Sequence, residues 1–213
     1  SYPQHFELTT LTALDNWELL AGQAAEFLPD SVVIANKDHY GVLKEALKSL
    51  PVKVYAGSDA VAQVVQGRGV DTVVNAMVGY AGLEPTVIAL SAGKKVALAN
   101  KESLVVAGDL IMGLSSRNKA PVIPVDSEHS AIFQCLAGEI GNRIENLILT
   151  ASGGPFRTFS QEQLLTVTKA QALKHPNWEM GAKITKDSAM IMNKGFEIIE
   201  ANGPFRVKPD TID

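Results

Sequence analysis

Asp71-Thr-Val-Val-Asn-Ala76, Lys95-Val-Ala-Leu-Ala99 and Pro121-Val-Ile-Pro-Val125 are three short runs of mostly apolar, β-prone residues. Between them lie two segments with the apolar spacing of helices, residues 83–92 and 102–112. Parallel strands need a long crossover connection, and this connection is usually a helix. The stretch from residue 71 to residue 125 therefore predicts an α/β fold with a parallel sheet between helices.

The same alternation extends toward the N-terminus of the chain. Strands are predicted at residues 6–12, 31–35 and 52–55. Each is followed by a predicted helix, at residues 16–27, 41–50 and 58–65. Together these elements predict a Rossmann-like, mostly parallel sheet over residues 1–125. Ligands of such sheets bind beyond the carboxyl ends of the strands. The Gly-rich fingerprint G-x-G-x-x-G, which usually opens a dinucleotide-binding fold, does not occur in the sequence.

The pattern changes from about residue 126, and we place a soft domain boundary near residue 125. Helices are predicted over residues 130–137, 161–172 and 188–201, and a strand over residues 144–149. Residues 126–213 are therefore expected to form part of an α+β domain.

Composition and charge restrict the class of protein. The net charge is −4, and no basic stretch is longer than Lys94-Lys95, so we expect no nucleic-acid partner. No apolar run reaches the roughly 18 residues of a membrane span, so we expect no membrane partner. Cys135 is the single cysteine and is predicted to be a small core residue of a protein in a reducing cytoplasm. Ser1 is not an initiator Met and both ends look cut, so we expect a fragment of a longer protein.

Three acidic residues suggest a metal site. Asp126 and Glu128 directly follow an apolar run, and residues at i and i+2 of an extended backbone project to the same side. Glu197 lies on a predicted helix. Converging carboxylates suit a hard cation such as Mg²⁺ or Mn²⁺. For an isolated Asp-x-Glu pair, however, acids on the surface of a strand end are the commoner explanation.

Other segments carry polar groups that suit an anionic ligand. In the predicted helix 188–201, Ser188 lies near the positive N-terminal end, and Asn193, Lys194 and Glu197 can share one face. An amphipathic surface helix would also explain this pattern. The turn Ser152-Gly153-Gly154 could approach a phosphate closely, but such a turn is weak evidence by itself.

Five ordered motifs make the chain resemble the 1-deoxy-D-xylulose 5-phosphate reductoisomerase family. They are Ala97-Leu-Ala-Asn-Lys-Glu-Ser-Leu-Val105, Pro124-Val-Asp-Ser-Glu-His-Ser-Ala131, Leu149-Thr-Ala-Ser-Gly-Gly-Pro-Phe-Arg157, His175-Pro-Asn-Trp-Glu-Met-Gly181 and Lys183-Ile-Thr-Lys-Asp-Ser-Ala-Met-Ile-Met-Asn-Lys-Gly-Phe-Glu197. The resemblance implies an NADPH-dependent oxidoreductase and isomerase of non-mevalonate isoprenoid biosynthesis. It also implies a phosphorylated ketose substrate, Mn²⁺ or Mg²⁺ (or Co²⁺) as the metal, and a homodimer. The implied compartment is the bacterial cytoplasm, or the plastid of a plant or alga.

The resemblance also implies a role for individual residues of this sequence. The metal ligands would be Asp126, Glu128 and Glu197, and the catalytic residues Lys101, Glu128 and His175. Substrate would be bound by Ser127, Ser152, Trp178, Ser188, Asn193, Lys194 and Glu197. The cofactor would be bound by Gly79, Asn100, Lys101, Glu102 and Met180. A mobile flap over the site would contain His175, Trp178 and Met180.

The chain departs from the family pattern at both ends. The N-terminal Gly-rich loop and the C-terminal helical domain of the family are absent from these residues. Residues 1–125 would then be a partial NADPH-binding domain and residues 126–213 a partial catalytic domain, so this chain alone would hold only part of the cofactor site. Two alternatives are a related oxidoreductase acting on another substrate, since a shared fold does not fix chemistry, and a non-catalytic metal- and sugar-phosphate-binding module.

Overall fold

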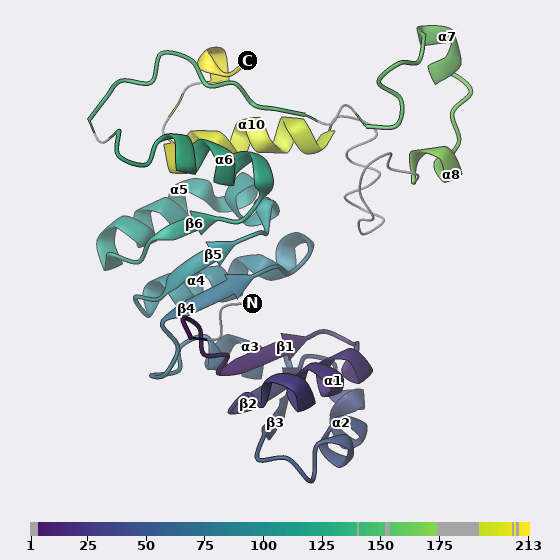
Figure 1. Cartoon of the computed structure of the whole chain (residues 1–213), viewed down its shortest axis with the longest axis vertical. Coiled ribbons are helices and arrows are strands. Elements are labelled where there is room, and N and C mark those ends of the chain that lie inside the picture. Colours follow the sequence, from purple (N-terminus) through teal and green to yellow (C-terminus); the bar gives the residue numbers. More distant parts are fainter. Residues whose placement is uncertain (1–3, 140, 152–153, 174–191, 206, 208) are drawn as a thin grey trace. The chain divides into compact units, whose positions relative to one another are not determined.

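Two compact units share the chain (Figure 1). The computed structural model describes residues 4–139, 141–151, 154–173, 192–205, 207 and 209–213. The first unit takes residues 1–75, 83–96 and 114–121, and the second takes residues 76–82, 97–113 and 122–213. The chain therefore enters each unit three times. The domain boundary near residue 125 stays a prediction.

The N-terminal sheet has the parallel pairing that the sequence predicted. Its strands β1 (Thr10–Ala13), β2 (Ser31–Ile34) and β3 (Lys53–Ala56) lie in the order β1-β2-β3. Ser31 of the central strand pairs with Thr10 on one side and with Lys53 on the other, in parallel register. All four residues of β2 are buried, as expected for a strand enclosed on both faces.

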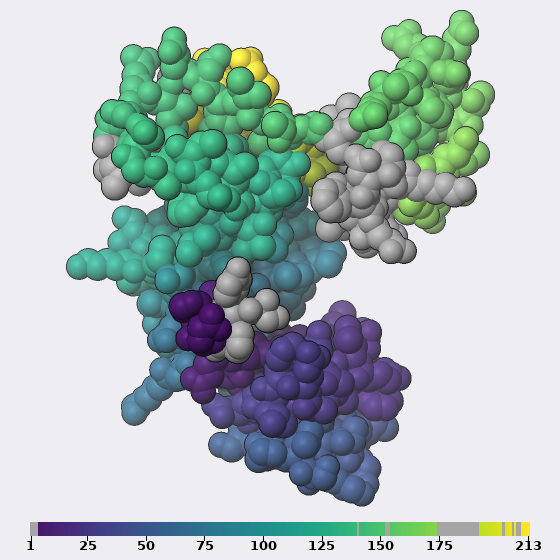
Figure 2. All heavy atoms as spheres, in the orientation of Figure 1, coloured from purple at the N-terminus to yellow at the C-terminus, as the bar shows by residue number. Residues whose placement is uncertain are grey.

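Helices pack this sheet into a hydrophobic core. The connecting helices are α1 (Trp17–Phe27), η1 (Lys37–His39), α2 (Tyr40–Ala46) and α3 (Ser58–Val64). Leu20 and Leu43 from α1 and α2 meet Val32 and Ile34 of β2 in one buried cluster. Asn16 caps α1 by accepting a hydrogen bond from the Leu19 N–H at 3.0 Å. In the space-filling view, the atoms of residues 10–64 form one closely packed body, coloured purple to blue (Figure 2).

A further sheet carries the three runs with which the sequence predicted the α/β fold. Its strands β4 (Thr72–Asn75), β5 (Lys95–Leu98) and β6 (Val122–Pro124) lie in the order β4-β5-β6. The segments between them form η2 (Gly79–Gly82), α4 (Leu83–Ser91) and α5 (Lys101–Asn118). The described residues therefore contain two three-stranded sheets in place of one continuous sheet. None of the described helices combines the length and the hydropathy that a membrane-spanning segment requires.

The C-terminal part is mainly helical in the residues that the structure describes. It contains α6 (Ser127–Cys135), α7 (Gln161–Leu164), α8 (Lys169–Ala172), α10 (Met192–Phe205) and η3 (Pro209–Thr211). Ile132 of α6 and Ala201 of α10 pack with Leu147, Leu149 and Val207 in a small core. This core brings α6 and α10, which carry the three acids, into one unit (Figure 1).

Three local predictions in this part were wrong. Among the described residues, the predicted strand at 144–149 is an isolated bridge between Leu147 and Ile212, where Leu147 and Leu149 form backbone hydrogen bonds with Thr211 and Asp213. The predicted helix at 161–172 is two short helices, since Ser160 and Thr168 each begin a helix with a capping box. Cys135 ends α6 on its exposed side and does not belong to the core.

Candidate metal centre

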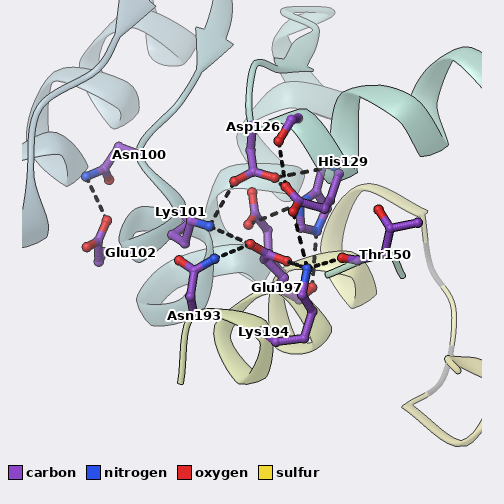
Figure 3. Close-up of polar contacts among 12 residues, drawn as sticks. Asn100, Lys101, Glu102, Asp126, His129, Thr150, Asn193, Lys194 and Glu197 are labelled. Carbon is purple, nitrogen blue, oxygen red and sulfur yellow. Dashed lines mark hydrogen bonds and ion pairs between the residues drawn. The ribbon is translucent and has the colours of Figure 1, made fainter. Parts of the chain in front are cut away.

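Three carboxylates converge in the second unit, and Figure 3 labels two of them, Asp126 and Glu197. Asp126, Glu128 and Glu197 each offer an oxygen atom, and these three atoms all lie within 4.8 Å of one another. Glu197 is fully buried, whereas Asp126 and Glu128 are partly buried. An all-oxygen, acidic set of this spacing fits a hard divalent cation such as Mg²⁺ or Mn²⁺.

The first two acids reach the site from the start of a helix and not from a strand. Strand β6 ends at Pro124, and Asp126 is the N-cap of α6, where its side chain accepts from the His129 N–H. Glu128 lies in the first helical turn, where a negative charge is favoured by the helix dipole. The predicted i, i+2 placement on an extended backbone was therefore wrong. An Asp residue is a preferred N-cap and begins the helix at this position.

Two lysines balance the negative charge of the acids. Lys101 Nζ lies 2.8 Å from Asp126 Oδ2 and 2.8 Å from Glu197 Oε1. Lys194 Nζ lies 3.4 Å from Glu128 Oε1 and also contacts the second carboxylate oxygen of Glu197. Every acid thus has a lysine partner, although Lys101 and Glu197 are 96 residues apart in the sequence. The site carries three carboxylates against two ammonium groups.

Protonation in the site follows from these contacts. Burial by itself lowers the pKa of Lys101, but its hydrogen bonds and charge interactions with Asp126 and Glu197 outweigh burial and raise it. Burial by itself raises the pKa of Asp126, but the hydrogen bonds from His129 and Lys101 hold it well below its usual range. Lys101 is therefore an ammonium and Asp126 a carboxylate at neutral pH.

A buried histidine connects the two helices that carry the acids. The His129 side chain is fully buried, its Nδ1 lies 3.1 Å from Asp126 Oδ1, and its Nε2 lies 3.1 Å from the Glu197 carbonyl oxygen. Its ring also stacks on Phe205, with centroids 6.0 Å apart. The Glu200 carboxylate oxygen Oε2 lies 3.5 Å from His129 Nδ1. Our interpretation of the sequence missed both roles, although His129 lies inside a quoted motif and Glu200 lies three residues after Glu197.

Of the other predicted site residues that the structure describes, Asn193 and Ser127 contact these acids, whereas Asn100 contacts Glu102 and Gly79. Asn193 donates a hydrogen bond to Glu197 Oε1, and Ser127 Oγ donates to Glu128 Oε2 at 2.7 Å. Asn100 lies one residue before Lys101, and its side chain contacts Glu102 at 3.3 Å. Gly79 begins η2 with a positive φ of 71°. The remaining predicted site residues fall outside the described ranges: Ser152, His175, Trp178, Met180 and Ser188.

Two family models match the chain and together cover most of it. The model described as 1-deoxy-D-xylulose 5-phosphate reductoisomerase matches residues 1–108. The model of the C-terminal domain of the same enzyme matches residues 122–205. The chain belongs to the 1-deoxy-D-xylulose 5-phosphate reductoisomerase family.

Relatives in this reductoisomerase family are similar over the whole chain. The protein named 1-deoxy-D-xylulose 5-phosphate reductoisomerase in Bacteroides fragilis is 62% identical over 212 residues, which are 100% of this chain and 55% of that protein. The relative of the same name in Bacteroides thetaiotaomicron is 63% identical, covering 100% of this chain and 54% of its own length. The chain therefore spans about half the length of the curated relatives that it matches.

Solved reductoisomerase structures share the fold. A crystal structure of DOX-P reductoisomerase in complex with NADPH, fosmidomycin and magnesium superposes with a TM-score of 0.91 at 38% identity, over 99% of this chain and 54% of that one. The Zymomonas mobilis enzyme in complex with NADPH superposes with a TM-score of 0.89 at 41% identity, over 99% of this chain and 54% of that one. These likenesses confirm the predicted α/β fold class.

Glu200 leads to a prediction about pH and stability. Burial raises the pKa of this carboxyl from 4.5 to about 7, although the nearby His129 opposes the shift. The folded state thus binds the proton more tightly than the unfolded state. The resulting stabilisation is complete below pH 4.5 and is lost as the pH rises through about 7. The whole shift corresponds to about 3 kcal/mol in the free energy of unfolding.

Glu200→Gln is expected to remove this pH dependence in the metal-free protein. The free energy of unfolding of the variant is compared with that of the unsubstituted protein by urea unfolding with a chelator present. This difference should shift in favour of the variant when the pH is raised from about 5 to about 8. The exposed Glu84 supplies the control, because Glu84→Gln should show the same difference from the unsubstituted protein at both pH values. A Glu200→Gln variant whose relative stability is also the same at both pH values would contradict the prediction.

Proposed function

We propose that the whole protein, with any sequence that flanks these residues, is a 1-deoxy-D-xylulose 5-phosphate reductoisomerase. It rearranges the ketose phosphate to a branched aldehyde and reduces this with NADPH to 2-C-methyl-D-erythritol 4-phosphate, a step of non-mevalonate isoprenoid biosynthesis. The proposal rests mainly on one observation: Asp126, Glu128 and Glu197 converge and form ion pairs with two lysines. The chain that carries this arrangement belongs to the reductoisomerase family. The crystal structure of a relative in complex with NADPH, fosmidomycin and magnesium supports it.

The three acids are the proposed ligands of Mg²⁺ or Mn²⁺, with Co²⁺ as a further candidate. A bound divalent ion supplies Lewis-acid chemistry to the oxygen atoms of the substrate. Lys101 and Lys194 hold the carboxylates at their present spacing by direct ion pairs. Their two positive charges also favour an anionic substrate near the acids.

The proposed substrate contacts surround the acids. Ser127, Asn193 and Lys194 present a hydroxyl, a carboxamide and an ammonium, which are groups that hydrogen-bond hydroxyl and phosphate oxygens. Ser152, Trp178 and Ser188 are further proposed contacts. His175 is proposed as a catalytic residue of a flap that also contains Trp178 and Met180, with Lys101 and Glu128 as the other catalytic residues. A closed flap would exclude water from the reaction.

The nicotinamide cofactor is proposed to bind beside the start of α5. Gly79, Asn100, Lys101 and Glu102 contribute to this side of the site, together with Met180. Residues 1–125 would be the partial NADPH-binding domain and residues 126–213 the partial catalytic domain. We further propose a homodimer in the bacterial cytoplasm, or in a plastid for a plant or algal source.

Substrate-dependent oxidation of NADPH tests the proposed function. The whole protein is mixed with 1-deoxy-D-xylulose 5-phosphate, NADPH and Mn²⁺ or Mg²⁺, and the loss of NADPH absorbance is followed. Turnover that requires the metal and is inhibited by fosmidomycin is expected. No oxidation with this ketose phosphate, but oxidation with another substrate, would identify a different oxidoreductase. If the protein binds Mn²⁺ but oxidises NADPH with none of the substrates tested, it would be a non-catalytic metal- and sugar-phosphate-binding module.

A further inference from the structure

The ammonium group of Lys101 lies between two of the three converging acids (Figure 3). Its Nζ is 2.8 Å from Asp126 Oδ2 and 2.8 Å from Glu197 Oε1, and the side chain is only 11% exposed. Within the part of the chain that the structure describes, these two carboxylates are the only hydrogen-bond or ion-pair partners of the ammonium group. Lys101 is therefore anchored by two of the proposed metal ligands.

The two carboxylate oxygens of Asp126 have different partners. Oδ1 accepts a hydrogen bond from the His129 backbone N–H at 3.4 Å, and the ring Nδ1 of the same residue lies 3.1 Å from it. The His129 side chain is fully buried, so these contacts hold the carboxylate in one orientation. Oδ2 is the oxygen that Asp126 still offers to a cation, and Lys101 holds it. A divalent ion and the ammonium group therefore compete for the same oxygen.

Distance and charge both oppose the presence of the two cations together. A Mg²⁺ ion lies about 2.1 Å from its oxygen ligands, so on Asp126 Oδ2 it would be at most about 5 Å from an ammonium group that stays 2.8 Å from the same oxygen. Two positive charges at this separation repel each other in a partly buried site. With two lysines the three acids keep one negative charge, and a divalent ion turns this into one positive charge. One ammonium group then becomes surplus.

The second lysine of the site is anchored differently. Lys194 Nζ contacts Glu197 and lies 3.4 Å from Glu128 Oε1, but it also donates a hydrogen bond to the Thr150 carbonyl oxygen. This carbonyl is a neutral backbone group and not one of the converging acids, so Lys194 retains a partner when an ion occupies the carboxylates. Lys101 has no such partner among the described residues. The contacts therefore single out Lys101 as the surplus ammonium group.

We propose that Lys101 is a built-in counter-ion of the metal site, which the divalent ion releases when it binds. In the metal-free protein its ammonium group bridges Asp126 and Glu197 and keeps these acids together. When the ion takes the two carboxylates, the ammonium group becomes available to an anionic oxygen of the substrate beside the acids. Binding of the metal thus provides the cation that receives the substrate. The inference rests on the metal site of the proposed function and deepens the role of Lys101 there.

Lysine labelling of the unsubstituted whole protein tests the release directly. The protein is treated briefly with an amine-acetylating reagent, once with a chelator and once with Mn²⁺, in the absence of substrate and NADPH, and each lysine is quantified by mass spectrometry. Mn²⁺ should increase the labelling rate of Lys101 by about fivefold or more, the low end of couplings between two ligands. Lys94 is the control, because its ammonium group donates to the Gly67 carbonyl oxygen at 2.8 Å and its labelling rate should not change.

Two variants of the whole protein add an equilibrium measurement. Lys101→Met removes the competing ammonium group, so the Kd of Mn²⁺ in a calorimetric titration should decrease by about tenfold or more. Lys194→Met is the matched control, because it also removes one positive charge from beside Glu197. Its effect on the Kd of Mn²⁺ should be smaller, since the Lys194 ammonium group keeps its bond to Thr150 and is not displaced.

The outcomes separate the inference from the proposed function. An unchanged labelling rate of Lys101 on addition of Mn²⁺ would overturn the release, and so would an equal decrease of the Kd in both variants, which is a general effect of charge. The labelling needs no substitution, so it decides even if Lys101→Met does not fold. If Mn²⁺ increases the labelling of Lys101 but the protein oxidises no NADPH with the ketose phosphate, the proposed function fails and the release stands.

Discussion

Glu197→Gln is expected to lower the affinity for Mn²⁺ by about 100-fold or more and to remove most turnover. Glu197 is the fully buried member of the three acids, and its two oxygens accept from Lys101, Asn193 and Lys194. A carboxamide at this position loses the negative charge and presents an N–H group to at least one of these donors. A 100-fold change corresponds to about 2.7 kcal/mol of binding free energy. Calorimetric titration with Mn²⁺ and the NADPH oxidation assay measure the two effects.

Glu200→Gln is the matched control for this experiment. Glu200 lies on the same helix, is 2% exposed and undergoes the same chemical change, but it is not among the three converging acids. Its Mn²⁺ affinity should remain near that of the unsubstituted protein. Equal losses of affinity in the two variants would show that any change of charge in α10 weakens binding, and the assignment of Glu197 as a ligand would fail.

Lys101→Met is expected to destabilise the metal-free protein by about 3 kcal/mol or more. The substitution keeps an unbranched side chain of similar length but removes the ammonium group that joins Asp126 to Glu197. Two partly or fully buried carboxylates would then face each other without this cation. Mn²⁺ should recover part of the loss, because the ion can supply positive charge at the same acids. Urea unfolding with a chelator and with Mn²⁺ measures both quantities.

Lys48→Met separates this effect from the general loss of a lysine. Lys48 also forms an ion pair with a glutamate, Glu45, but the two side chains are 69% and 71% exposed. Exposed pairs contribute little to stability, so little change is expected with or without Mn²⁺. If Lys101→Met were no more destabilising than Lys48→Met, the Lys101 ammonium group would not be needed to balance the acids.

The difference between β6 and α6 shows what a local sequence pattern can predict at the site. The apolar run before residue 126 predicted a strand, and the strand is present at Val122–Pro124. The same pattern could not show that a helix would begin at Ser127 with Asp126 as its N-cap. Capping of a helix competes with continuation of the strand over one or two residues. The Asp126 side chain accepts a hydrogen bond from the backbone N–H of His129, and this bond favours the helix.

The sequence by itself determined the α/β alternation, the parallel pairing and the three acids as a candidate metal site. These features follow from residue types and from spacing along the chain, which govern local conformation. Only the tertiary structure decided that Lys101 joins Asp126 to Glu197 and that His129 lies between these acids and Glu200. The physical reason is that charges and hydrogen-bonding groups interact through space, so their partners depend on how β5, α6 and α10 pack.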